Sequence, residues 1–205
     1  MSGQVLVELK DTRHIAIIGG VGLGKTTYAR YLVGKALQEH DDLQVIVYGA
    51  RDKKWEALEH LGFITLYSME DTITGRLRDT ETYLDTDKET LVVIDDISYT
   101  LHMLPSEEHE AVINRLHKLL TSENVFSIIT SLRPLNGYYP KELLDLANTK
   151  IALNVENDFD YTSFFQSKAY KTNNECPQER GQAFIDTKTT RDPILIQSSR
   201  SITLK

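Results

Sequence analysis

Apolar and polar residues follow one another along the chain in a pattern that predicts alternating strands and helices. Residues 14–18 form an apolar run, residues 26–40 carry apolar positions at helical spacing, and residues 44–48 form a short β-branched run. A strand, a helix and a second strand in this order predict a βαβ unit with parallel strands and a right-handed crossover. The apolar stripe of the helix, which includes Leu32 and Ala36, should face the sheet.

The same alternation continues over the rest of the chain. Further strands are expected at residues 5–9, 63–66, 91–94, 125–130 and 151–155. Further helices are expected at residues 55–61 and 140–146, and residues 69–88 predict an exposed helix followed by an acidic loop. After Pro105 and Ser106, apolar positions over residues 112–120 predict the buried face of another helix. Near the end, residues 183–187 and 194–197 flank a polar turn and predict a β-hairpin. The pattern predicts a single α/β domain over residues 1–205, either complete or excised from a longer chain.

The apolar run at residues 14–18 leads into a glycine-rich segment followed by helix-forming residues. The spacing Gly19-x-x-x-x-Gly24-Lys25-Thr26 is that of a phosphate-binding loop. Glycines let backbone N–H groups wrap closely around a polyphosphate, and the following helix points the positive end of its dipole at the anion. Lys25 should reach the β- and γ-phosphates, and Thr26 should offer its hydroxyl to Mg²⁺. We therefore predict that ATP binds through residues Gly19, Gly20, Val21, Gly22, Leu23, Gly24, Lys25, Thr26 and Thr27.

Two carboxylates, Asp95 and Asp96, follow the apolar run at residues 91–94. An apolar run that ends in acids is typical of a central parallel strand with ligands at its carboxyl end. A Mg·ATP site needs a carboxylate on the strand beside the phosphate loop to hold the metal through water, so Asp95 is predicted to hold Mg²⁺ in this way, together with the hydroxyl of Thr26. Asp96 either orients or deprotonates the attacking water, or is a solvated acid at the strand end. Many NTPases use the longer Glu here, and a shortfall of order 1 Å can cost about 10²-fold in rate, so slow hydrolysis is expected.

A third group of candidate catalytic residues follows the apolar run at residues 125–130. Thr130 and Ser131 could donate a hydrogen bond to the γ-phosphate or to the attacking water. Arg133 could serve this site or that of a neighbouring subunit, and a surface arginine after a strand-ending turn is an equal alternative.

Composition narrows the classes of partner. The chain has 30 acidic and 23 basic residues and a formal net charge of −7 at pH 7. Nucleic acid is therefore not favoured, because affinity for its backbone depends on clustered Lys and Arg. No stretch approaches the roughly 18 apolar residues of a membrane span. The single cysteine, Cys176, cannot form an internal disulfide, which fits a reducing compartment, and the six histidines lack metal-ligand spacing.

Nearly the whole chain resembles the FtsK/HerA superfamily of motor ATPases. Beyond the phosphate loop, the resemblance rests on LVVIDD, VFSIITSLRP, TKIALNVENDFDY, ERGQAFID and PILIQ, in that order. The DFDY stretch and the RG-hairpin-Q ending are most similar to the C-terminal ATPase domains of EssC/EccC-type coupling proteins of type VII secretion. The resemblance implies an α/β P-loop NTPase fold of the ASCE, RecA-like class, with a mainly parallel central sheet flanked by helices and a C-terminal β-hairpin.

Two departures from the superfamily bear on activity. Asp96 stands where DNA-translocating relatives carry Glu, and Leu132 stands where their TQRP segment has its glutamine. The resemblance therefore implies a P-loop ATPase that binds ATP and Mg²⁺ with low hydrolysis. Its role would be that of a domain of a type VII secretion coupling protein, acting in substrate recognition and protein export.

The resemblance also implies partners and a location. Secreted protein substrates and neighbouring ATPase domains are the expected partners, with a hexameric ring as one arrangement. The expected location is the cytoplasm, at the cytoplasmic face of the membrane, with membrane attachment only through upstream segments of a larger protein. An FtsK/HerA-like DNA translocase or packaging ATPase is the alternative, which the net charge of −7 disfavours. A small-molecule kinase is a third alternative, opposed by the lack of an arginine-rich lid.

Overall fold

The computed structural model describes residues 12–50, 55–68, 73–83, 87–134, 138–153, 158–166, 182–187 and 193–197. The strands of these segments form one eight-stranded sheet. They are β1 (His14–Ile18), β2 (Gln44–Ala50), β3 (Phe63–Ser68), β4 (Thr90–Ile94), β5 (Val125–Ser131), β6 (Thr149–Ala152), β7 (Gln182–Thr187) and β8 (Ile194–Gln197). The helices are α1 (Lys25–Glu39), the 3₁₀ helix η2 (Glu56–Leu61), α2 (Ile73–Tyr83), α3 (Ile97–His102), α4 (Ser106–Leu120), α5 (Lys141–Leu144) and α6 (Asp158–Phe165).

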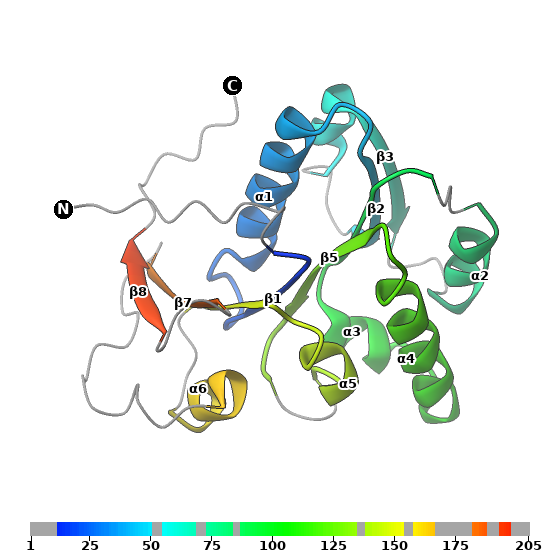
Figure 1. The fold of residues 1–205 in the computed structure, drawn as a ribbon. Coiled ribbons are helices and arrows are strands. Elements are labelled where there is room, and N and C mark those ends of the chain that lie inside the picture. The colour runs from blue at the N-terminus through cyan, green and yellow to red at the C-terminus, as the bar shows by residue number, and fades with distance from the viewer. Residues whose placement is uncertain are drawn as a thin grey trace.

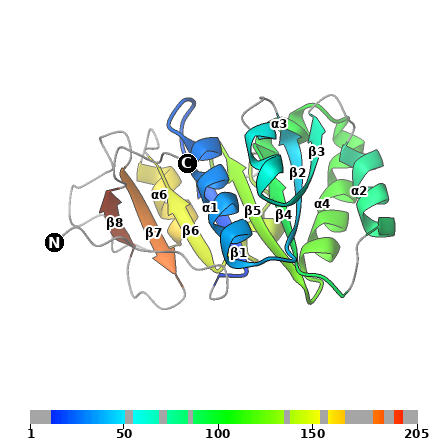
Figure 2. The ribbon, with the colours of Figure 1, turned by 90° about the horizontal axis from the view of Figure 1, so that it is seen from above.

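In the fold drawn in Figure 1, the strand order is β3-β2-β4-β5-β1-β6-β7-β8, which can be followed by the labels of Figure 2. Strands β1 to β6 pair in parallel, whereas β7 pairs antiparallel with β6 and β8 pairs antiparallel with β7. The predicted α/β P-loop NTPase class, with its mainly parallel sheet and C-terminal hairpin, is confirmed. The prediction differs from the structure in one respect. The strand that leads to Asp95 and Asp96, β4, does not lie beside the phosphate-loop strand β1, because β5 lies between them.

Helices cover both faces of the sheet, as Figures 1 and 2 show. Side chains alternate along a strand, so strands covered on both sides are continuously apolar. On one face, Ile15 and Ile17 of β1 belong to a buried cluster with α1 and η2. On the other face, Ala16 and Ile18 belong to a cluster that includes residues of α2 to α6. The phosphate-loop strand is therefore fixed from both sides, and β1 is buried at every position.

Several predicted elements differ from the observed ones in type or length. The helix at residues 55–61 is the 3₁₀ helix η2, the helix at 69–88 is α2, and the helix at 140–146 is the single turn α5. The helix predicted after Pro105 and Ser106, with its apolar face at residues 112–120, is α4. The strand predicted at 151–155 is β6, which begins at Thr149 and ends at Ala152. Sequence reasoning did not anticipate α3 or α6. The strand predicted at residues 5–9 lies outside the described residues.

Candidate nucleotide and magnesium site

The glycine-rich loop joins β1 to α1 at the carboxyl end of the parallel strands. Gly22 and Gly24 have φ angles of +75° and +96°, in the left-handed region that favours glycine. Gly19 passes so close to the end of β6 that a Cβ atom there would lie 2.8 Å from the Cβ of Leu153. The sequence spacing of these glycines thus matches positions where the backbone needs them.

The amino-terminal end of α1 is open to an anion. Gly24 occupies the N-cap position, no side chain caps this helix end, and its first turn carries no acidic residue. Backbone N–H groups of a first helical turn lack partners within the helix, and the helix dipole adds positive potential there. Together with the glycine loop, this helix end has the chemistry of a phosphate site.

The side chain of Lys25 is hydrogen-bonded to the backbone of the glycine-rich loop. This side chain is buried, and Nζ donates hydrogen bonds to the carbonyl oxygens of Gly19 at 2.8 Å and Gly20 at 3.1 Å. The ammonium group is thereby held against the loop that would wrap the phosphates. Val21, at the tip of the loop, is 86% exposed and contributes backbone rather than side-chain packing.

Asp95 brings three elements together through its carboxylate. Oδ1 accepts hydrogen bonds from the hydroxyl of Thr26 on α1 at 3.0 Å and from that of Thr130 on β5 at 3.1 Å. Oδ2 accepts a hydrogen bond from the indole Nε1 of Trp55 at 3.1 Å. The predicted metal ligands Thr26 and Asp95 are therefore in direct contact, although β5 separates their strands.

The buried carboxylate of Asp95 has the environment of a cation-binding group. Burial raises the pKa of this carboxyl group; hydrogen bonds from Trp55, Thr26 and Thr130 oppose the shift, and the nearby charge of Asp96 adds to it. Within the described residues, no Lys or Arg forms an ion pair with Asp95. Buried carboxylates are normally paired with a cation or coordinate a metal. A carboxylate and a hydroxyl side by side are oxygen ligands of the kind Mg²⁺ prefers, so the donor set fits Mg²⁺.

The next residue, Asp96, caps a helix. It adopts φ 69° and ψ 71°, and its Oδ1 accepts hydrogen bonds from the backbone N–H of Tyr99 at 3.2 Å and from the hydroxyl of Ser98. Its own backbone N–H donates to Thr130 Oγ1 at 2.8 Å. Thr130 thus accepts from Asp96 and donates to Asp95, which fixes the relative position of the two acids. The carboxylate of Asp96 stabilises the start of α3 in this structure.

The remaining predicted residues lie in the turn after β5. Ser131 Oγ lies 2.9 Å from the carbonyl oxygen of Arg133 and 3.0 Å from that of Tyr138, so it stabilises the turn. The guanidinium of Arg133 pairs with the buried carboxylate of Asp160 on α6. The structure therefore brings Thr130 to the Asp95 carboxylate and directs the polar groups of Ser131 and Arg133 to other partners.

Sequence reasoning missed three residues around the site. Trp55 appeared only as the first residue of a predicted helix and Asp160 only as part of the DFDY stretch, and Gly49 lay just beyond the strand predicted at residues 44–48. Gly49 has φ +81°, and a Cβ atom there would lie 2.6 Å from the carbonyl oxygen of Asp95. Its position at the end of an apolar strand in the sequence was the one available signal, because Gly in a strand often marks a close backbone approach.

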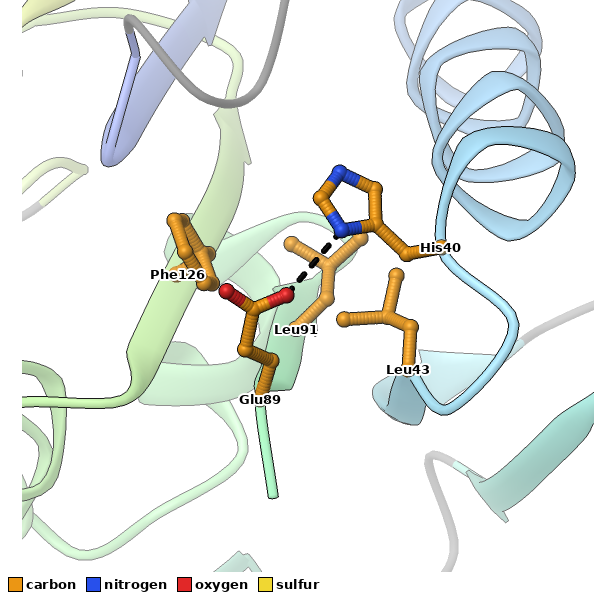
Figure 3. Close-up of a pocket in the computed structure, with 5 residues that line it drawn as sticks. All are labelled: His40, Leu43, Glu89, Leu91 and Phe126. Carbon is orange, nitrogen blue, oxygen red and sulfur yellow. Dashed lines mark hydrogen bonds and ion pairs between the residues drawn. The ribbon is translucent and has the colours of Figure 1, made fainter. Parts of the chain in front are cut away.

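A shallow hollow lies at the opposite end of the sheet. It is lined by His40, Leu43, Glu89, Leu91 and Phe126 (Figure 3). His40 follows the last residue of α1, and a hydrogen bond of 3.0 Å joins its Nδ1 to Oε2 of Glu89 just before β4. Because the phosphate loop lies at the other end of α1, this hollow is remote from the candidate site.

The family described as novel STAND NTPase 3 matches residues 2–163, which is most of the chain. The chain belongs to this nSTAND3 family. No curated protein sequence matches this nSTAND3 chain. None of the helices in the part of the chain that the structure describes is long and apolar enough to cross a bilayer.

Solved structures similar to this nSTAND3 chain share its fold at low sequence identity. EssC (ATPases 2 and 3) from Geobacillus thermodenitrificans has a TM-score of 0.70 and 16% identity, over 92% of this chain and 39% of that one. The pCW3 conjugation coupling protein TcpA, solved with ATPγS, has a TM-score of 0.66 and 15% identity, over 96% of this chain and 62% of that one. The genome packaging NTPase B204 from Sulfolobus turreted icosahedral virus 2, also with ATPγS, has a TM-score of 0.59 and 11% identity, over 90% and 97%.

The predicted resemblance to EssC-type ATPase domains is confirmed at the level of the fold. The nSTAND3 chain spans less than two thirds of the EssC and TcpA chains that it matches. EssC, TcpA and B204 have different descriptions and share this fold, so the likeness shows the fold and does not select one role.

Proposed function

We propose that this domain binds Mg·ATP between the glycine loop, Lys25 and the Thr26–Asp95 pair. The observation that carries the proposal is the 3.0 Å contact between Thr26 Oγ1 and Asp95 Oδ1, directly below an uncapped helix end. A hydroxyl has one hydrogen and two lone pairs, so Thr26 can donate to Asp95 and still offer a lone pair to a cation. When bound, Mg²⁺ would neutralise charge on the phosphates, with Thr26 and Asp95 as the residues that hold it.

The catalytic half of the site supports slow hydrolysis. Asp96 accepts hydrogen bonds from the first turn of α3, and Arg133 is paired with Asp160. The side chain of Leu132 has no hydrogen-bonding group. Of the predicted catalytic set, Thr130 is the residue whose hydroxyl reaches the Asp95 carboxylate. ATP would then act chiefly as a ligand that stabilises one conformation, and slow hydrolysis would end that conformation.

Titration with a fluorescent ATP analogue in the presence of Mg²⁺ tests nucleotide binding. Lys25→Ala is expected to weaken binding by roughly 10- to 100-fold, because it removes a charged donor from the loop. Lys35→Ala, on the same helix but ten residues further along, is the matched control and should bind like wild type. Wild-type affinity in the Lys25 variant would exclude this site.

The biological role that we infer is coupling of ATP binding to a protein partner, as a domain of a type VII secretion coupling protein at the cytoplasmic face of the membrane. The likeness to EssC supports this role, and the net charge of −7 disfavours a nucleic-acid partner. Secreted proteins and neighbouring ATPase domains are the proposed partners. The likeness to TcpA and B204 supports the alternative of a DNA translocase or packaging ATPase.

Electrophoretic mobility shift with duplex DNA at low salt separates the two roles, since electrostatic binding is strongest there. The secretion role predicts no shift, with or without ATPγS and Mg²⁺. A salt-sensitive shift that ATPγS strengthens would favour the DNA-translocase alternative.

A further inference from the structure

We propose that Trp55 is a positioning residue for Mg²⁺, holding the Asp95 carboxylate so that Oδ1 faces Thr26. Because Trp55 would act on the nucleotide site, this role rests on the proposed function. The observation is the 3.1 Å hydrogen bond from Trp55 Nε1 to Asp95 Oδ2, from a side chain with 0% exposure.

The two oxygens of Asp95 have different partners. Oδ1 accepts from the hydroxyls of Thr26 and Thr130, whereas Oδ2 accepts from the indole of Trp55. A carboxylate can turn about its terminal torsion with little restriction unless both oxygens are held. The indole therefore fixes the plane of the carboxylate and leaves Oδ1 directed towards the amino-terminal end of α1.

Packing fixes the indole in turn. Trp55 stands immediately before η2 and belongs to the same buried cluster as Leu58, Val33 and Leu37. A phenylalanine would supply most of this apolar surface without a polar group. A buried indole N–H is unfavourable without an acceptor, so its pairing with Asp95 is the chemistry that a purely apolar residue would not provide.

A neutral donor suits a site that must receive a cation. Lys or Arg at this place could hold the carboxylate equally well, but its charge would repel Mg²⁺ and neutralise the carboxylate. An indole has a donor and no acceptor, so it orients Asp95 without adding charge and without competing as a ligand. Residues that orient metal ligands in this way typically change metal affinity by 10- to 100-fold when removed.

An isosteric replacement tests the indole N–H itself. Benzothienylalanine at position 55 keeps the shape of the ring and replaces Nε1–H by sulfur, and Trp55→Phe is the simpler companion variant. In EDTA, we expect both variants to bind ATP with wild-type affinity. The Mg²⁺ concentration that produces half of the Mg²⁺-dependent gain in ATP affinity should be about 10-fold higher or more in both variants. Leu58→Val, which trims the same cluster and keeps the indole, is the control and should retain the wild-type Mg²⁺ requirement.

A second readout uses Trp55 as the only tryptophan of the chain. The ¹⁵N-labelled protein should give one indole N–H resonance, which should move in Asp95→Asn and again when Mg²⁺ is added to the ATP-bound protein. A folded benzothienylalanine variant with an unchanged Mg²⁺ requirement, or an indole resonance indifferent to Asp95→Asn, would overturn the role of Trp55. Wild-type protein that fails to bind ATP at all would instead overturn the proposed function, and this role with it.

Discussion

Arg133 and Asp160 form a two-contact ion pair between the turn after β5 and helix α6. Arg133 Nε donates to Asp160 Oδ2 at 2.9 Å, and Nη2 donates to Oδ1 at 3.2 Å. The Asp160 side chain is 2% exposed, whereas that of Arg133 is 39% exposed. Paired arginine–carboxylate contacts of this kind combine charge with fixed geometry, so the pair should fasten α6 to the strand that carries Thr130.

The first prediction follows from this pair. Arg133→Ala removes the two charged hydrogen bonds that Arg133 makes to the buried Asp160 carboxylate and is expected to lower the free energy of unfolding by about 2–3 kcal/mol. Asp79→Ala is the control, because it breaks the exposed Arg76–Asp79 pair and leaves the guanidinium of Arg76 over the ring of Tyr67, so it should change stability by less than about 0.5 kcal/mol. Urea denaturation measures both. Equal losses in the two variants would mean that the Arg133–Asp160 pair does not stabilise the fold.

The second prediction concerns Gly49, where β2 passes the backbone of Asp95. Gly49→Ala adds a Cβ atom 2.6 Å from the Asp95 carbonyl oxygen at a left-handed φ of +81°. Gly24→Ala has a similar φ of +96° but nothing within 4 Å of the new atom, so it isolates the backbone strain. We expect about 1 kcal/mol of destabilisation for Gly24→Ala and at least about 2 kcal/mol for Gly49→Ala, measured by thermal unfolding.

The extent to which the sequence reveals the site depends on how far apart in the chain its residues lie. The glycine loop, Lys25 and Thr26 form a continuous motif, so their placement at one helix end could be predicted. Asp95 could be predicted because an apolar strand directly precedes it.

Contacts between distant residues left no such local signal. Trp55 and Asp95 are 40 positions apart, and Arg133 and Asp160 are 27 apart. Nothing in the apolar spacing around residue 55 shows where the indole N–H will point. Helix α6 was missed because its eight residues, which include Asp158 and Asp160, have no apolar stripe at helical spacing long enough to predict a helix. The predicted catalytic roles of Asp96, Ser131 and Arg133 stay predictions.

The third prediction is a pH dependence that originates at Asp95. Burial raises the pKa of its carboxyl group above the ordinary value of 3.8, so the folded protein binds this proton more tightly than the unfolded chain. The contribution to stability is therefore fully present below the ordinary value and is lost as the pH rises through the raised pKa. In nucleotide-free protein, Asp95→Asn should remove this decline and should be more stable than wild type at neutral pH. Parallel thermal unfolding series from pH 4 to pH 8 measure the difference, and parallel curves for the two proteins would contradict it.

The fourth prediction separates two roles of Asp96. Asp96→Asn keeps an oxygen that can cap α3 and tolerates the positive φ, whereas Asp96→Ala loses the cap and should cost about 1–2 kcal/mol. If Asp96 also orients the attacking water, Asp96→Asn should lower the hydrolysis rate with stability unchanged. Unfolding curves and single-turnover hydrolysis on the same samples distinguish capping from catalysis. A wild-type rate in Asp96→Asn would assign the residue to capping alone.

The fifth prediction is that turnover is slow and can be raised. Wild-type protein should hydrolyse ATP at a rate well below the roughly 10 s⁻¹ of a typical enzyme. The side chain of Leu132 cannot form a hydrogen bond, and the short side chain of Asp96 caps α3. The double variant Asp96→Glu, Leu132→Gln restores the reach and the amide of the DNA-translocating relatives and should raise the rate by about 10-fold or more. Adding Asp95→Asn should abolish the gain, which shows that any increase arises at this site and not from a contaminating ATPase. A wild-type rate near 10 s⁻¹ would show that the existing residues suffice, and ATP would then drive repeated cycles of conformational change instead of holding one state.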